Sequence, residues 1–589
     1  MTPSMFNKHS WSCLVYLLIV TLPMGCDPNI WGLGKEKATT RPSGTIDESS
    51  PILRQSLALK GTIGEVTYVQ GLRGMHVRGA GLVRGLSGKG SRKCPSSIRN
   101  ELIREIRKTY SANPDITPSM TAEQLIDSLD TAAVQVEGVI PFGLSKGQRF
   151  DIFVRSVGQE VQTIAGGYLM QCDLKIIKEV SPEEVIPGKI HARACGPVFI
   201  NPFAPTEQKG SPIGHQAGTV IGGGVNLVDR RLNLVSIIES YATVRQIVET
   251  INRRFGGKKT IANAVSPNNI ELEVPPEFVN REKRFLSLIT HLPLTSSQMQ
   301  LEARANALAG ELTRYDSPHE HIGTALEGIG TSVLPMIQRL YTDPRREVNY
   351  YASRTGLRLG DDLAIDVIIR HAQDQRSPFR LQAINELADC GMPGRAGRAL
   401  RELLKDPDAP IRVLAYKALR KVDRSSMLII PVGKESRNFT LDIVLSEGPA
   451  TIYAYRTQYR RIALIGGDRL VFQPPLLYSE VGKPVTLSAG AGDKLLTVIR
   501  KNDAGNIIVK PFKVPLSVTD LIRFMGADPI KRSNGSLKGL GIDYTIILDM
   551  LYRLCEKGAI NADFRWEEPS VEELLGRPLE PTGRPESEL

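Results

Sequence analysis

The most distinctive part of the chain is Val69-Gln-Gly-Leu-Arg-Gly-Met-His-Val-Arg-Gly-Ala-Gly-Leu-Val-Arg-Gly-Leu-Ser-Gly-Lys-Gly90, which contains seven glycines. Its end resembles a phosphate-binding loop in composition. However, Val83 stands where that motif needs its first glycine, and Gly90 replaces the Ser or Thr that should follow Lys89. We therefore expect a flexible glycine-rich loop over 79–90, with no bound nucleotide.

Short strand-like runs separated by glycine-rich turns surround this segment. Two stretches with helical spacing of apolar residues interrupt them. The expected strands are Thr62–Val69, Ala132–Val136 and Phe150–Val157, and the expected helices are Ser96–Tyr110 and Ala242–Phe255. Residues 61–296 therefore predict an α+β region, in which Gly222-Gly-Gly224 is a backbone bend or mobile loop.

Residues 297–425 read as helices with an internal near-repeat. Asp343, Asp374 and Asp406 start units spaced 31 and 32 residues apart. Each Asp lies in the turn that ends one helix, and an apolar residue and an Ala four positions apart follow on the inner face of the next helix. These helix pairs resemble HEAT repeats, which form a solenoid. An unrelated helical bundle is the alternative.

Strands return after residue 426, and a helical pair follows them. The expected strands are Phe439–Leu445, Thr451–Tyr455, Arg461–Ile465, Val485–Leu487 and Leu495–Ile499, and the expected helices are Val518–Met525 and Tyr544–Lys557. Residues 426–566 therefore form a second α+β region, and the tail 567–589, with seven Glu and two Arg, predicts a disordered acidic segment. The fold class is α+β, with β-rich domains interrupted by an inserted all-α solenoid.

The composition is that of a folded, multidomain protein. The 589 residues are 41% hydrophobic and 23% charged, which excludes a wholly disordered or collagen-like chain. The net charge of +11 is spread along the chain without a long basic run. Charge alone selects no partner, and we expect no nucleic acid.

Residues 1–26 have the pattern of an export signal: a weakly basic start, a short apolar run from Leu14 to Val20, and Gly25-Cys26. Cys26 is a candidate for lipid attachment because the site resembles a bacterial lipobox, although Pro23 and Met24 depart from that pattern. Cleavage by an ordinary signal peptidase is the alternative. Residues 27–60 predict a flexible tether, and the mature protein should lie outside the cytoplasm.

Export permits disulfides. Cys172 and Cys195 lie in strand-like runs on either side of the turn Ser181–Glu184. An antiparallel hairpin around that turn would bring the two cysteines nearly opposite each other, where a disulfide can form. Two buried free thiols are the alternative.

Candidate catalytic and metal-binding motifs are weak. Gly143-Leu-Ser145-Lys-Gly147 matches a nucleophile elbow, but a strand follows Ser145 where that motif needs a helix. His319 and His321 would point apart on a helix, and no third ligand follows. We expect a polar turn and surface histidines, and therefore no enzyme, no cofactor and no metal site.

The segment Val69–Gly90 resembles the N-terminal signature of the bacterial flagellar P-ring protein family, because its glycines have the family's order and spacing. Further blocks resemble the family in the same order, strongly over 61–296 and more weakly over 427–566. They include Gly147-Gln-Arg-Phe-Asp-Ile152, Tyr241–Asn252, Ile270–Pro275, Ile462–Asp468 and Asp543–Phe564. The resemblance implies an exported structural protein of the flagellar basal body in the periplasm. It would form a homo-oligomeric ring around the rod, with the L ring and peptidoglycan as neighbours.

The sequence also departs from this family. Its chain is longer, a lipid anchor is unusual there, and Gln171-Cys-Asp173 replaces a small polar stretch. A lipid-anchored envelope scaffold or adaptor on the same fold, without a flagellum, is therefore the alternative, and a hydrolase using Ser145 is a third hypothesis. Candidate ring contacts are the glycine-rich segments 79–90 and 222–224 and the basic helix Arg99–Lys108, for which a solvated surface is equally compatible. The helical repeats offer a surface to a protein partner.

Overall fold

The computed structural model describes residues 56–567, apart from short internal gaps. The gaps are 73, 112–119, 159, 182–183, 201–215, 258, 280, 434–437, 457–458, 480–483, 502–506, 508–510 and 531–537. None of the helices within this described part is long and apolar enough to cross a membrane.

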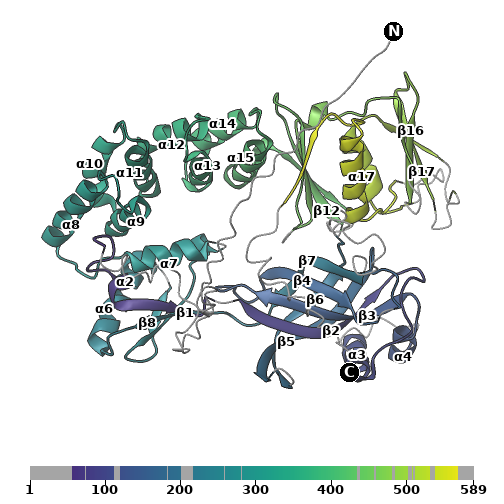
Figure 1. The fold of residues 1–589 in the computed structure, drawn as a ribbon, viewed down its shortest axis with the longest axis horizontal. Coiled ribbons are helices and arrows are strands. Elements are labelled where there is room, and N and C mark those ends of the chain that lie inside the picture. The colour runs from purple at the N-terminus through teal and green to yellow at the C-terminus, as the bar shows by residue number, and fades with distance from the viewer. Residues whose placement is uncertain are drawn as a thin grey trace, which may run out of the picture. The chain divides into compact units, whose positions relative to one another are not determined.

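Six antiparallel strands close into a barrel in the order β2-β3-β4-β7-β6-β5 (Figure 1). They are β2 (Met75–Arg84), β3 (Thr131–Ile140), β4 (Arg149–Ser156), β5 (Tyr168–Ser181), β6 (Glu184–Pro197) and β7 (Ala217–Asn226). In β4, Phe150, Ile152 and Val154 alternate with more exposed residues and are buried in the barrel core, as period-two patterning requires. The helices α3 (Ser96–Ser111) and α4 (Ala122–Ile126) connect β2 to β3 and share a second apolar cluster with β2.

The glycine-rich segments are largely strands of this barrel, which corrects their expected loop character. Residues 79–84 belong to β2, and a Cβ on Gly81 would lie 2.7 Å from Val136 Cγ2 and 2.8 Å from Leu169 Cδ1. Gly222 lies in β7 with a φ of +59°, close to a break in register with β4. Glycine is needed at position 81 because the barrel wall leaves no room for a side chain. It is needed at position 222 because the backbone there is left-handed.

A four-stranded antiparallel sheet of order β1-β8-β10-β9 adjoins the barrel in sequence. Its elements are α2 (Ile63–Val66), β1 (Thr67–Gln70), β8 (Leu232–Ser236), α6 (Tyr241–Phe255), β9 (Ala262–Ala264), β10 (Asn269–Leu272), η2 (Pro276–Phe278) and α7 (Glu282–Thr290). Val244, Ile247 and Ile251 of α6 enter its core, as their spacing predicts. The expected strand from Thr62 is wrong over 63–66, which form a helical turn. There a Cβ on Gly64 would lie 2.8 Å from the carbonyl oxygen of Thr290.

Helices fill the region from residue 298 to residue 422, which we call the helical array (Figure 1). They are α8 (Gln298–Glu311), α9 (His319–Ile329), α10 (Leu334–Ile337), α11 (Arg346–Arg358), α12 (Ala364–Gln373), α13 (Arg380–Asp389), α14 (Pro393–Leu403) and α15 (Ala409–Val422), with the short η3 (Thr331–Val333) and η4 (Gln338–Leu340). Each Asp of the near-repeat makes the same turn. The Oδ1 atoms of Asp343, Asp374 and Asp406 each accept the backbone N–H two residues later, at 2.9 Å.

The C-terminal part contains two sheets. The first has the order β11-β12-β14-β13-β19 and the second β15-β16-β17-β18. Their strands are β11 (Leu428–Val432), β12 (Phe439–Val444), β13 (Thr451–Ala454), β14 (Arg461–Ile465), β15 (Leu476–Tyr478), β16 (Val485–Ala489), β17 (Leu495–Arg500), β18 (Phe512–Pro515) and β19 (Asp563–Trp566). The expected strands and helices of this part are confirmed, including α16 (Val518–Gly526) and α17 (Tyr544–Glu556). Gly558 follows α17 with a φ of +69° and ends it.

The first C-terminal sheet is buried on both faces. Leu441, Ile452 and Leu464 pack into a core with α16 and α17. Tyr453 and Ala463 point to the opposite face and join the apolar core of the helical array. This array is therefore one of two layers that cover the sheet.

The end of the expected tether also belongs to the fold. Ala58 and Leu59 are buried, and Ala58 joins the core of the helical array. Arg304 of α8 donates to the carbonyl oxygens of Lys60 and Ala58. Residues 58–60 of the expected tether therefore belong to the fold, because Ala58 joins the core of the helical array and Arg304 holds this stretch of backbone.

Candidate functional site

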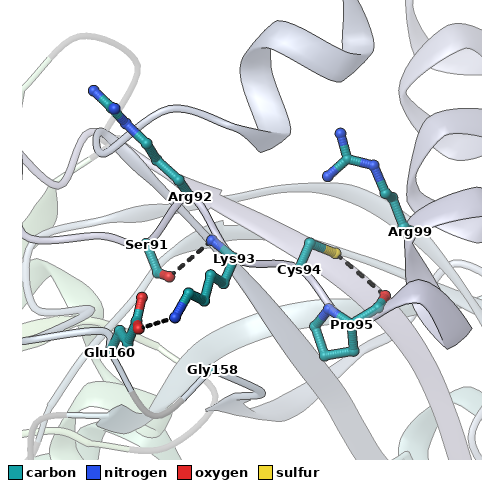
Figure 2. Close-up of a pocket in the computed structure, with 8 residues that line it drawn as sticks. All are labelled: Ser91, Arg92, Lys93, Cys94, Pro95, Arg99, Gly158 and Glu160. Carbon is teal, nitrogen blue, oxygen red and sulfur yellow. Dashed lines mark hydrogen bonds and ion pairs between the residues drawn. The ribbon is translucent and has the colours of Figure 1, made fainter.

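A pocket of about 630 Å³ opens beside the barrel, where the chain leaves β2 and enters α3 (Figure 2). Its lining comes from the loop before α3, the first turns of α3 and the loop after β4. The lining residues are Ser91, Arg92, Lys93, Cys94, Pro95, Arg99, Gly158 and Glu160. Three cationic side chains and one carboxylate give the pocket a basic character.

Ion pairs hold two of the three cations. Lys93 pairs with Glu160 across the pocket, as Figure 2 shows. Arg99 donates two hydrogen bonds of 2.7 Å to Asp127, and these bonds hold the pKa of that carboxyl below its usual value. Arg92 is exposed. The pocket thus has little free positive charge to offer an anionic group.

The pocket has no catalytic arrangement. Burial raises the pKa of the Cys94 thiol, whose Sγ lies 3.7 Å from the carbonyl oxygen of Pro95. A thiol that stays protonated is a poor nucleophile. The lining contains no histidine that could act as its base. The pocket therefore lacks the paired thiolate and histidine of a cysteine nucleophile.

The basic helix expected as a ring contact is largely neutralised within the chain. Arg107 pairs with Glu123, and Lys108 pairs with Asp173, whose side chain is buried on β5. Together with the Arg99 pair, these contacts tie α3 to α4 and to the barrel. Arg104 is an exposed cation of this helix. The charge pattern that favoured a binding face therefore serves the internal fold.

The enzyme and metal motifs do not form sites. Ser145 lies in the turn between β3 and β4, and its backbone N–H donates to Gln148 Oε1 at 2.8 Å. The strand β4 follows at Arg149, so the helix of a nucleophile elbow is missing. His319 stacks on Tyr351 with ring centroids 5.8 Å apart, whereas His321 turns toward His291. Within the described residues, no cluster of metal-ligating side chains is found.

The hairpin that should join Cys172 and Cys195 is present as β5 and β6, but the expected register is off by one residue. Cys172 lies opposite Ala194, and both cysteines are free thiols in the structure. Successive side chains of a strand point to opposite faces, so Cys195 points away from Cys172. The register changes at several points between Cys172 and the turn, and these breaks set its pairing with Ala194. Cys26 lies outside the described residues.

Two groups of buried charged residues were not predicted from the sequence. Asp442 on β12 and Arg412 on α15 have no exposed surface. Glu327 on α9 and Glu386 on α13 are likewise buried. The sequence did contain a signal for Asp442, because it is the single charged residue in the otherwise apolar run Leu441–Leu445. Nothing local identifies the partners, which come from distant helices.

Comparison with known proteins gives one family. The model of the flagellar P-ring protein family matches residues 62–305, from α2 into α8. A flagellar P-ring protein of Oleidesulfovibrio alaskensis is 24% identical over 245 residues, which are 40% of this chain and 60% of the relative. That of Wolinella succinogenes is 24% identical over 299 residues, 49% of this chain and 74% of the relative. That of Geotalea uraniireducens is 28% identical over 259 residues, 41% of this chain and 63% of the relative.

The chain spans about 60% of the length of the first curated relatives that it matches. The family match takes in the barrel and the β1-β8-β10-β9 sheet and stops within α8. The weaker resemblance over 427–566 lies beyond this match and stays a prediction.

Proposed function

We propose that the protein is a structural subunit of a ring around the flagellar rod, because the model of the flagellar P-ring protein family matches residues 62–305 and curated flagellar P-ring proteins are similar to the chain. The ring lies in the periplasm at the peptidoglycan layer, with the rod and the L ring as neighbours. The observation that carries the proposal is the family match over the barrel and its adjoining sheet. A structural role also agrees with a barrel interior filled by side chains.

A closed ring needs heterologous contacts, in which one face of a subunit meets a different face of the next. One suitable face lies at the end of the β1-β8-β10-β9 sheet. There Ile237, Ile238, Tyr241 and Val265 are each about half or more exposed, and a hydrogen bond from Ser240 N–H to the carbonyl oxygen of Pro267 joins the two loops that hold them. Single exposed apolar residues are ordinary, whereas a group of them marks a contact surface. A second copy of this chain is the proposed occupant.

This contact can be tested with a matched pair of variants. Tyr241→Ser removes the most exposed aromatic ring of the patch, and Tyr315→Ser removes one that is 96% exposed in the α8–α9 loop. We expect Tyr241→Ser to reduce ring assembly in electron micrographs of envelope preparations and Tyr315→Ser to leave it intact. Equal assembly of both variants would exclude the patch as a ring contact.

Domain organisation and anchoring are further parts of the proposal. Residues 61–296 and 426–566 are taken as P-ring-type regions and 297–425 as a HEAT-like array, a division supported by the repeated Asp turns. Lipid attachment at Cys26 would hold the N-terminus on a membrane. A Cys26→Ser variant should then leave the membrane fraction and lose the mass of the lipid. Lipidation at Cys26 would be contradicted if the variant stayed in the membrane fraction and its mass differed from that of the wild type only by the Cys-to-Ser substitution.

The decisive experiment is mass spectrometry of purified hook–basal bodies from the source cells, together with imaging of their rings. We expect this chain at many copies per rod, with density beyond an ordinary P ring at the peptidoglycan level. Strains that lack the gene should lose motility, and both the wild-type chain and Ser145→Ala should restore it. If the chain is found in the envelope but is absent from basal bodies, the function moves to a non-flagellar scaffold. Failure of Ser145→Ala alone would point to a hydrolase.

A further inference from the structure

The helical array is joined to a C-terminal strand by a fully buried carboxylate. Asp442 lies on β12, between β11 and β14 of the five-stranded sheet, and has no exposed surface. Its Oδ2 accepts a hydrogen bond of 2.6 Å from the hydroxyl of Tyr416 and another of 2.6 Å from Nε of Arg420. Both donors lie on α15. The last helix of the array therefore donates both of these hydrogen bonds to Oδ2. Arg461 of β14 adds an ion pair at 3.6 Å, and Oδ1 is buried without a hydrogen-bond partner among the described residues.

A buried cation makes the reciprocal contact. Arg412 of α15 has no exposed surface, and its Nε donates to Thr451 Oγ1 on β13 at 2.8 Å. Its Nη1 donates to the carbonyl oxygens of Asp406 and Pro407, both at 2.8 Å, and its Nη2 pairs with Asp563 on β19. One side chain thus connects the start of α15 with two strands of the sheet.

A second ionic cluster joins the array to α7, which precedes it in the family-matched region. Arg284 of α7 pairs with Glu327 of α9 at 2.8 Å. Arg358 of α11 lies 3.3 Å from Glu327 and donates from Nε to Glu386 of α13 at 2.8 Å. Charges of alternating sign therefore run across α7, α9, α11 and α13.

The same ionic cluster extends from α7 to α13 and α15. Arg281, the N-cap residue of α7, pairs with Asp389 of α13 at 2.8 Å, and Asp389 also pairs with Lys421 of α15. Ion pairs thus connect helices α9 and α13 of the array to α7 of the same chain. The array's apolar core likewise takes in Ala58 at one end and Tyr453 at the other.

Burial of an unpaired charge is strongly unfavourable, so the two hydrogen bonds from Tyr416 and Arg420 stabilise Asp442 together with the ion pair from Arg461 of β14. From these contacts we propose that the helical array is an internal brace, which binds α7 and the five-stranded sheet of the same chain and makes them one folding unit. The brace holds the family-matched region and the C-terminal region in a fixed connection. The side chains that make these contacts are thereby engaged within the chain.

Two probes follow the two ends of this unit in the full chain. Replacing Trp11 and Trp31 with Phe leaves Trp566 of β19 as the only tryptophan, so its fluorescence reports on the five-stranded sheet. Circular dichroism at 222 nm follows the helices, and α8 to α15 of the array contribute slightly more than half of the α-helical residues within the described part of the chain. On urea unfolding, a brace predicts coincident transitions from both probes. Two separated transitions would overturn the proposal.

Variants then test the connection itself. Removing one partner of a buried ion pair by Asp442→Ala should raise the unfolding equilibrium constant by roughly two to three orders of magnitude, in both probes together. Asp366→Ala breaks the Arg395–Asp366 pair inside the array, where both side chains are about half exposed, and should change it less than about fivefold. A shift in fluorescence without a shift in the helical signal would overturn the proposal.

A milder variant keeps the test valid if Asp442→Ala fails to fold. Tyr416→Phe removes a single hydrogen bond to the same carboxylate and leaves the ring in place. It should raise the unfolding constant about tenfold in both probes. An unchanged helical transition in Tyr416→Phe would refute the brace, and its result does not depend on whether the protein forms a flagellar ring.

Discussion

Acid should weaken this protein through His291, which follows α7 and is fully buried. Its Nδ1 lies 2.7 Å from the carbonyl oxygen of Ser287 and therefore carries the proton that is donated. Its Nε2 lies 3.1 Å from Nδ1 of His321, and the two rings stack with centroids 5.3 Å apart. Burial, together with the positive charge of Arg304 and the neighbouring His321, lowers the pKa of His291 to about 4.

The sign follows from linkage. The unfolded chain binds a proton at His291 near pH 6.5, whereas the folded protein resists protonation until about pH 4, so acid favours the unfolded state across this window. Between pH 7 and about pH 5 the loss from this one group is about 2 kcal/mol, and it approaches about 3 kcal/mol below pH 4. Stability contributed by the neutral imidazole is fully present above pH 6.5.

The assay compares urea unfolding at several pH values for the wild type and for His291→Asn, whose amide can still donate to Ser287 but does not titrate. We expect the wild type to lose about 2 kcal/mol more than the variant between pH 7 and about pH 5. His76→Asn, on the exposed side of β2, is the matched control and should keep the wild-type pH dependence. Identical pH dependence of wild type and His291→Asn would refute the assignment.

Three further predictions concern stability measured by thermal or urea unfolding. Gly356→Ala should destabilise by about 2 kcal/mol, because its Cβ would lie 1.7 Å from the Tyr341 hydroxyl, which bonds to Asp361. Gly310→Ala, on α8 with open space around it, should instead stabilise by about 0.5–1 kcal/mol, and equal effects of the two would contradict the packing argument. Gly81→Ala should cost about 1–3 kcal/mol by crowding the barrel core, so wild-type stability would contradict a closed barrel. Ser145→Ala should stay within about 0.5 kcal/mol, and a larger loss would mean that its hydroxyl has an unrecognised partner.

Local patterns predicted most of the secondary structure because each rests on spacing that a single element imposes. The helical spacing of Val244, Ile247 and Ile251 gave α6 to within one residue of its start. The same holds for the alternation of Phe150, Ile152 and Val154 in β4. Asp343 and its two repeats correctly predicted where the turns of the array lie. The reason is local, because an Asp side chain in a turn can accept the backbone N–H two residues later.

Long-range relations could not be predicted in this way. Asp442 stands out in its strand, but its partners Tyr416 and Arg420 precede it by 26 and 22 residues on a helix whose own pattern does not point to a sheet. The register of Cys172 against Ala194 depends on irregularities along β5 and β6, which shift side chains to the other face without any mark in local composition. Both failures concern which elements meet, and neither concerns what the elements are.

The glycines of the family signature show why the resemblance is stronger evidence for the fold than for assembly into a flagellar ring. A Cβ on Gly79 would lie 2.4 Å from the carbonyl oxygen of Asp173, and one on Gly90 would lie 2.0 Å from that of Thr131. These positions exclude side chains because neighbouring backbones of the barrel approach closely. The signature therefore records a packing requirement of one chain. A relative with the same close approach of backbones needs glycine at these positions, whether or not it surrounds a rod. Finding the chain in basal bodies is therefore the observation that separates a flagellar ring subunit from a non-flagellar scaffold.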